Sequence, residues 1–140
     1  MIDIKDIQIG DSVLINGVPK KIQAVDGLDN EIIADGEIYC MAEDRYQSED
    51  KVNGIPITPE ILEKNGFKNY GESWYLPDDN VNVMVGFYMY KTSIHVKKGD
   101  NIFQKEVGCS YRACAKNRNV HIHTLQHALC LCGIDKEIKI

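Results

Sequence analysis

Apolar and polar residues alternate with a period of two through much of residues 9–41, and turn dipeptides interrupt the alternation. Asn16-Gly17 separates two such runs and Asp35-Gly36 separates two more. Both dipeptides tolerate the positive φ angles that a two-residue hairpin turn requires. The pattern predicts a meander of short antiparallel strands, either open or closed as an SH3-like barrel, followed by an acidic connector over 42–53. The expected strands are residues 12–15, 18–25, 31–34 and 37–41.

A short capped helix is predicted next. Thr58 is suited to the N-cap, and Pro59 is suited to the first helical position, where its missing N–H costs nothing. Gly66 is placed to adopt a left-handed conformation after the last turn. Phe67 would then close a hydrophobic contact with Leu62.

The rest of the chain predicts a second antiparallel sheet that is covered by a C-terminal helix. Residues 81–90 form the longest alternating run, and shorter runs follow at 93–97 and 102–107. Between Thr124, the expected N-cap, and Gly133, the expected stop, apolar residues recur at helical spacing. The apolar stripe of this helix consists of Leu125, Ala128, Leu129 and Cys132.

Composition fits a globular α+β protein with two small domains, residues 1–55 and 56–140. Of the 140 residues, 44% are hydrophobic and 26% are charged. No apolar run approaches the roughly 20 residues needed to cross a bilayer, and the chain does not begin like a signal peptide, so we expect a cytoplasmic protein without a membrane partner. The five cysteines are an odd number, which favours thiols over a disulfide framework.

The net charge of −5 is unevenly distributed. Residues 1–55 hold 5 basic and 12 acidic residues, whereas residues 56–140 hold 11 basic and 9 acidic ones. The basic excess lies within 91–118 and directly follows two tyrosines, which is one pattern for nucleic-acid binding. The overall acidity opposes that interpretation, which stays an alternative. Its candidate contacts are Tyr88, Tyr90, Lys97, Arg112, Lys116 and Arg118.

A metal site is a second alternative. His123, His127 and Cys130 are spaced i, i+4 and i+7, and imidazole and thiolate suit zinc. Thr124 as N-cap would leave His123 outside the helix, and no spacing motif nominates a fourth ligand. We therefore predict neither a metal nor a cofactor. The possible fourth ligands are His121, Cys109 and Cys114.

Catalytic signatures are missing from the sequence. Cys114 lies between two cationic residues that could lower its pKa, but neither a histidine base nor an oxyanion donor is placed for it. No phosphate loop, dinucleotide motif or nucleophile elbow is present. We predict a protein-interaction module with no catalytic residue, which binds a protein partner through a sheet edge or the His127/Cys130 side of the last helix. Its oligomeric state is left open.

Three segments also carry a family resemblance. They are Ile7-Gln-Ile-Gly-Asp-Ser-Val13, the capped helix over 56–67, and Val120-His-Ile-His-Thr-Leu-Gln-His-Ala-Leu129. In this order they resemble a group of small uncharacterised proteins carried by prophages and other mobile elements of gut anaerobic bacteria. Those proteins pair an opening IGN-V strand with an LTEEIL-KNGF helix and a closing VHQLQN helix. The resemblance implies a bacterial, phage-linked setting and no particular reaction.

Overall fold

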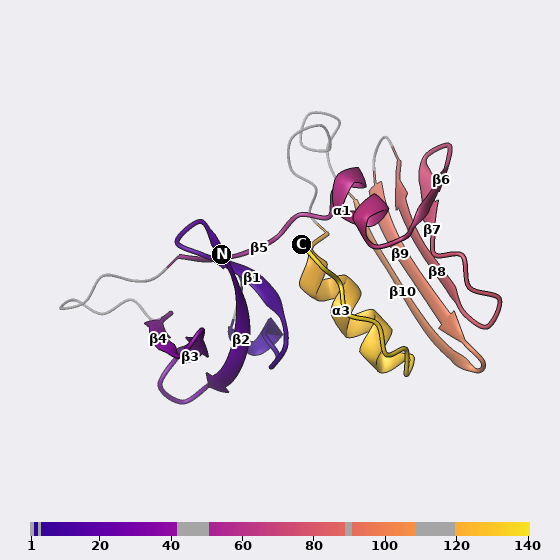
Figure 1. The fold of residues 1–140 in the computed structure, drawn as a ribbon. Helices are drawn as coiled ribbons and strands as arrows, with labels where there is room; N and C mark the ends of the chain where they lie inside the picture. Colours follow the sequence, from indigo (N-terminus) through magenta and orange to yellow (C-terminus); the bar gives the residue numbers. More distant parts are fainter. Residues whose placement is uncertain (1, 3, 42–50, 89–90, 109–119) are drawn as a thin grey trace. The chain divides into compact units, whose positions relative to one another are not determined.

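A computed structural model describes residues 2, 4–41, 51–88, 91–108 and 120–140 (Figure 1). The chain divides into two compact units, Met1–Ile55 and Pro56–Ile140. Each unit contains one five-stranded antiparallel sheet, and a helix lies near the C-terminus, so the predicted α+β fold is confirmed at this level. Among the described helices, none is both long and apolar enough to cross a membrane.

The first unit is a meander with one additional strand. Its strand order is β4-β3-β2-β1-β5, and no sheet of the described residues closes on itself, so the SH3-like barrel is not confirmed. Val52–Gly54 pairs with the first strand of the sheet, which shows that the predicted connector over 42–53 ends in a strand. The elements are η1 (Ile4–Asp6), β1 (Ser12–Ile15), β2 (Val18–Asp26), β3 (Glu31–Ala34), β4 (Glu37–Cys40) and β5 (Val52–Gly54).

Two-residue turns join the strands of this meander where the sequence predicts them. Asn16 and Gly17 have φ angles of 50° and 83°, and Asp35 and Gly36 have φ angles of 51° and 77°. Two successive positive φ angles define the turn whose twist matches that of paired strands. The side chain of Asn16 also accepts a hydrogen bond from the Lys51 amide at 2.9 Å, which ties this turn to the chain entering β5.

One face of the first sheet supplies the core of its unit. Along β1 and β3 every second residue is buried, as expected for strands with one face turned inward. The segment before β1 adds Ile2 and Ile7 to this core. The most completely buried large strand residues in the cluster are Val13, Ile15, Ile22, Ile32 and Val52.

The second unit begins with the capped helix α1 (Pro59–Lys64). The Thr58 Oγ1 accepts a hydrogen bond from the Ile61 amide at 3.3 Å. At the other end, Gly66 has a φ of 85° and the Phe67 amide donates to the Leu62 carbonyl at 3.0 Å. These are the predicted N-cap and the predicted left-handed termination, and both are confirmed.

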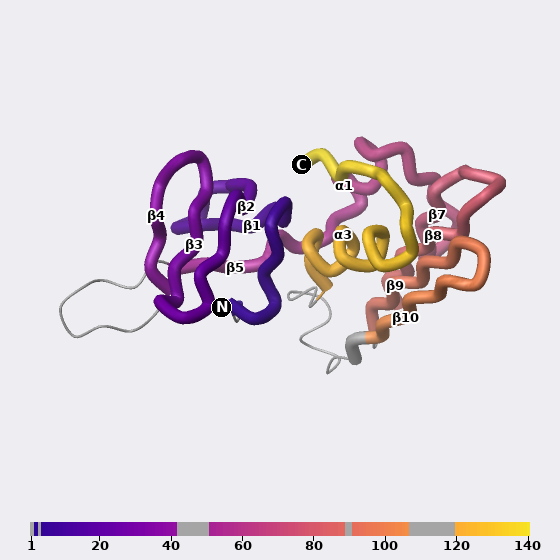
Figure 2. The backbone as a smooth tube through the Cα atoms, turned by 90° about the horizontal axis from the view of Figure 1, so that it is seen from below, coloured from indigo at the N-terminus to yellow at the C-terminus, as the bar shows by residue number. Residues whose placement is uncertain are grey.

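A second sheet in the order β10-β9-β8-β7-β6 follows α1. Helix α3 (Ile122–Leu131) lies along one face of its β9 and β10 strands, as Figure 2 shows. The core between them contains buried strand residues and the predicted helix stripe, including Val85, Ile94, Leu125 and Leu129. The strands are β6 (Lys68–Tyr70), β7 (Ser73–Tyr75), β8 (Asn82–Phe87), β9 (Lys91–Lys98) and β10 (Asn101–Gly108).

Helix α3 begins earlier than the sequence indicates. Its N-cap is His121, with extended φ and ψ angles, so the prediction that Thr124 caps the helix is wrong. Val120 and Ile122 are both buried, which extends the apolar face one turn upstream of Leu125. Burial of that turn outweighs the preference of threonine for a cap, and His123 lies inside the helix as a result.

The C-terminal tail is held to α1 by one buried side chain. The Asn65 Nδ2 donates to the carbonyls of Ile61 and Lys139, each at 2.7 Å. Its Oδ1 accepts from the Lys139 amide, also at 2.7 Å. Asn65 therefore satisfies backbone groups of the tail in the way a neighbouring strand would, and Ile138 is buried beside it at 4% exposure.

Candidate binding surface

The second sheet has one face covered by α3 and one face turned away from it. Successive residues of a strand point to opposite faces, and directly paired residues share a face. Val85 and its partner Ile94 are buried on the α3 side, so Met84 and its partner His95 lie on the other. We call this second side the outer face. Its residues are Lys68, Tyr70, Ser73, Tyr75, Asn82, Met84, Gly86, Lys91, Ser93, His95, Lys97, Ile102, Gln104 and Glu106.

An exposed aromatic pair occupies one edge of the outer face. Tyr70 is 73% exposed and Tyr75 is 37% exposed, although both have large apolar rings. Their centroids are 6.0 Å apart and their planes meet at 73°, which is the favourable edge-to-face geometry. The hairpin β6–β7 thus presents two rings that already support each other. The sequence analysis missed this pair because it did not detect strand β6.

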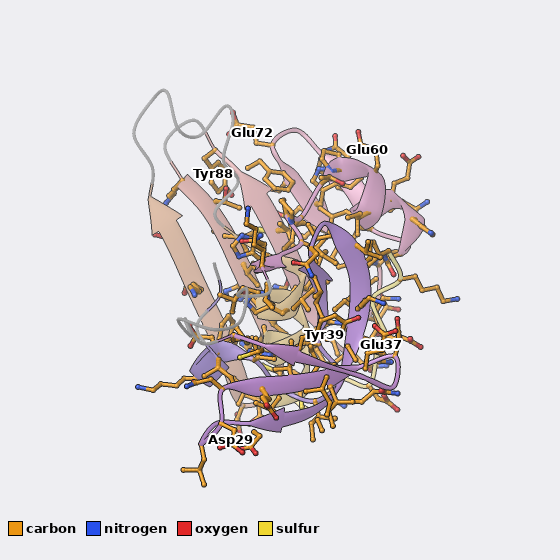
Figure 3. The ribbon with its side chains drawn as sticks, turned by 90° about the vertical axis from the view of Figure 1, so that its left-hand side faces the viewer. Asp29, Glu37, Tyr39, Glu60, Glu72 and Tyr88 are labelled. Carbon is orange, nitrogen blue, oxygen red and sulfur yellow. The ribbon has the colours of Figure 1, made fainter. Side chains whose placement is uncertain are left out.

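Tyr88 is the predicted contact whose surroundings the structure describes most fully. Its hydroxyl lies 3.3 Å from Ser73 Oγ, and a Cβ placed on Gly86 would be 2.6 Å from its ring. The Lys91 Nζ lies over the ring at 5.6 Å and also pairs with Glu106 at 3.2 Å. Figure 3 labels Tyr88 near Glu72 at the end of this sheet. Tyr88 therefore packs on the sheet itself, over Gly86, where a larger side chain would displace the ring.

The basic segment is divided between the two faces of the sheet. Lys97 lies on the outer face, but Lys98 and Lys105 lie on the side of α3. The Lys98 Nζ donates to the Gly133 carbonyl at 2.9 Å. The described part of the segment does not form one continuous cationic strip. The remaining predicted contacts Tyr90, Arg112, Lys116 and Arg118 lie outside the described residues, as do Cys109 and Cys114.

Three histidines gather at the start of α3. The rings of His121 and His123 stack with centroids 5.4 Å apart, and those of His123 and His127 meet edge-on at 5.7 Å. Cys130 is exposed one turn further along the helix. Within the described ranges, no group of three or more His, Cys, Asp or Glu side chains is placed to hold a metal ion. The helix therefore brings the predicted histidines together without forming a recognisable ligand set.

Electrostatics favour the neutral imidazole of His121 in this cluster. Burial lowers the pKa of His121, and the nearby Lys105 cation lowers it further. His123 is only 7% exposed. Neutral rings can stack closely beside the N-terminal end of a helix, whose dipole is positive and would repel an imidazolium. The cluster is thus suited to packing at neutral pH.

The first unit contains a smaller polar cluster on strands β2 and β4. Lys20 pairs with Asp35 at 3.1 Å and lies 5.9 Å from the centroid of the Tyr39 ring. The Tyr39 hydroxyl donates to Glu37 at 2.8 Å, and this hydrogen bond raises the pKa of Tyr39 (Figure 3). The Asp35 hydrogen bond raises the pKa of Lys20. Both shifts favour the ordinary protonated forms of Lys20 and Tyr39, and the Lys20–Asp35 contact links the β3–β4 turn to β2.

Relationship to known proteins gives no further guidance. Comparison with protein-family models, curated proteins and solved structures finds no match to this chain. The prophage-linked resemblance therefore stays a prediction. Function has to be inferred from the chain's own surface, where the outer face is the most distinctive feature.

Proposed function

We propose that this protein is a non-catalytic interaction module that binds another protein through the outer face of its second sheet. The observation that carries the proposal is the exposed Tyr70–Tyr75 pair on the hairpin β6–β7. Tyrosine is enriched at the energetic centres of protein interfaces, because it combines a large apolar area with a polar tip and has few rotatable bonds. Paired rings that are already positioned lose little conformational freedom on binding.

A protein partner is favoured over a nucleic acid by the way the sheet distributes its cations. A strand of nucleic acid needs lysines and arginines that follow its backbone together with ring faces open for stacking. Lys97 and Lys98 point to opposite faces, and the Tyr88 ring is occupied by Gly86 and Lys91. The outer face offers exposed aromatic side chains as anchors, which are enriched at protein interfaces.

The His127/Cys130 side of α3 is a weaker site for the same role. It exposes Cys130 together with Leu131, which is 69% exposed, but no aromatic side chain. His127 is already in ring contact with His123. A cytoplasmic, phage-linked setting belongs to the proposal as well. The cytoplasmic part is supported by Cys130 and Cys132, which form no disulfide within the described residues, as is usual in a reducing compartment.

Site-specific crosslinking tests the proposal. A photoreactive phenylalanine analogue at position 70 is expected to capture a discrete partner in bacterial cells that carry the gene. The matched control places it at Ile38, which is 65% exposed on the edge of the first sheet. Tyr75→Ala in the crosslinking chain should reduce the yield about tenfold, because it removes half of the aromatic anchor. Equal products from positions 70 and 38, or a yield unaffected by Tyr75→Ala, would contradict the proposal.

A further inference from the structure

We infer that the outer face recognises an extended protein segment in which acidic side chains flank an apolar centre. The inference rests on the proposed function and adds the chemistry of the partner. The features that carry it are the sign of the charges on the outer face and their positions relative to the aromatic and apolar residues.

The charges left available on the outer face are positive. Among the described residues, Lys68 and Lys97 are exposed and form no ion pair. The one carboxylate on this face belongs to Glu106, and Lys91 already neutralises it at 3.2 Å. The other nearby acids are confined to the turns at the strand ends. They are Glu72, Asp78, Asp79 and Asp100. A partner that carries acidic side chains is therefore complementary to the face, and a basic one is repelled.

The two lysines lie at opposite ends of an apolar row. Strand pairing aligns Lys68 with Tyr75, then Met84, then His95 across the sheet. Lys97 lies two residues beyond His95 on β9, on the same face. Four neighbouring strands span about 14 Å at the usual spacing of about 4.8 Å, and the two residues along β9 add about 7 Å in the perpendicular direction, so Lys68 and Lys97 are about 16 Å apart. An extended segment covers that distance in about four to five residues.

This arrangement sets the pattern of the ligand. An acidic residue at each end can reach Lys68 and Lys97 while apolar residues between them lie over Tyr75 and Met84. Charge pairs at the rim of an interface mainly determine the choice of partner and its orientation. The buried apolar centre supplies most of the affinity.

Selection from a random twelve-residue peptide display library tests this pattern with the full-length protein. Peptides bound by the wild type are expected to be enriched in Asp and Glu about four to five residues apart with apolar residues between. The variant K68E/K97E should lose the binding of those peptides by at least about tenfold and select basic residues instead. The control K105E/K139E makes the same change in net charge at exposed lysines of the same unit that do not belong to the outer face, and it should select as the wild type does.

Several outcomes would overturn the inference. Selected peptides without acidic enrichment, or K68E/K97E selecting as the wild type does, would remove the acidic pattern. Salt-dependent binding of the oligonucleotides dT20 or U20 that K68E/K97E abolishes would assign the face to nucleic acid instead. Crosslinking at Tyr70 tests the proposed function separately. If the crosslink forms and K68E/K97E leaves its yield unchanged, the interface stands and the partner chemistry is wrong.

Discussion

Each unit contains a five-stranded antiparallel sheet, but the two units cover the inner face of that sheet in different ways. In the first unit the chain before β1 joins the core through Ile2 and Ile7, and the described part contains no α-helix. In the second unit α3 packs against β9 and β10, with Leu125 and Leu129 buried. A helix that packs on one face of a sheet leaves the opposite face available. The candidate binding surface is thus found on the unit whose core is closed by a helix.

The two units also differ in their balance of basic and acidic residues. Residues 1–55 carry 5 basic and 12 acidic residues, and residues 56–140 carry 11 and 9. Among the described acidic residues of the first unit, Asp26 lies at a turn, where it accepts hydrogen bonds from the amides of Leu28 and Asp29. Such residues serve the backbone conformation of hairpins. The second unit, with a small excess of basic residues, instead has exposed lysines and exposed tyrosines on the outer face of its sheet.

The largest expected loss of stability comes from substitutions that disrupt each core separately. Leu129→Ala in the second unit and Ile32→Ala in the first should each destabilise by about 3 kcal/mol, because each removes a fully buried side chain. Residue-resolved hydrogen exchange of the full chain measures where the loss falls. Leu129→Ala should accelerate exchange in β8 and β9, and Ile32→Ala in β2 and β3. Equal acceleration in both sheets from either variant would show that the two cores unfold as one.

The second effect concerns the buried amide that holds the tail. Asn65→Asp replaces a donor of two hydrogen bonds by a carboxylate that faces two carbonyl oxygens. We expect a loss of about 2–3 kcal/mol in urea denaturation, since the buried acceptors lose their donor. The control Asn82→Asp, at an exposed site of β8, should change stability by less than about 0.5 kcal/mol. A similar loss in both variants would mean that added charge, and not the hydrogen bonds, is responsible.

The third effect compares turns in the two units. Gly66 ends α1 with a φ of 85°, and Gly17 closes the first hairpin with a φ of 83°. Alanine at either position should cost about 1 kcal/mol, because a side chain disfavours that conformation and no neighbouring atom obstructs it. Thermal unfolding of Gly66→Ala and Gly17→Ala measures both costs. A much larger loss for one of them would reveal packing that positive φ does not explain.

The smallest expected effect is a pH dependence of folding stability that arises from His121 in the second unit. The folded-state pKa of His121 is below its usual value of 6.5, so the unfolded chain binds the proton more tightly. The associated stability is present above pH 6.5 and is lost as the pH falls from there through the folded pKa. The measurement is the urea midpoint between pH 5 and 8, a range that extends at least about one unit to either side of the usual histidine pKa of 6.5. The midpoint should fall at acidic pH for the wild type and should fall less for His121→Gln. His95→Gln on the outer face is the control, and its curve should follow the wild type.

Local signals predicted the capped helix and the hairpin turns correctly. Thr58, Pro59 and Gly66 each have one strongly preferred role within a few residues of sequence. Asn16-Gly17 and Asp35-Gly36 likewise encode their turns without help from the rest of the chain. Features of this kind depend on backbone chemistry that adjacent residues supply, which is why sequence alone was sufficient.

Tertiary context decided the features that sequence reasoning missed. β5 and β6 are each three residues long, and the pattern of alternation is too short to detect in them. β5 exists because β1 offers a pairing edge and Val52 is fully buried there. The first turn of α3 is stabilised by burial of Ile122, which no capping rule anticipates. Tyr70 and Tyr75 could have been found only by recognising that Gly71 turns one short strand onto the next.

The contact between Tyr88 and Gly86 also provides a spectroscopic probe. One α-proton of Gly86 points toward the Tyr88 ring, because a Cβ built in that direction would be 2.6 Å from the ring. The ring current of Tyr88 therefore shifts the NMR resonance of this proton. A molecule that settles on this side of the sheet and shifts the ring will move that resonance. One glycine signal can therefore report occupancy in an unmodified sample, before any ligand has been identified.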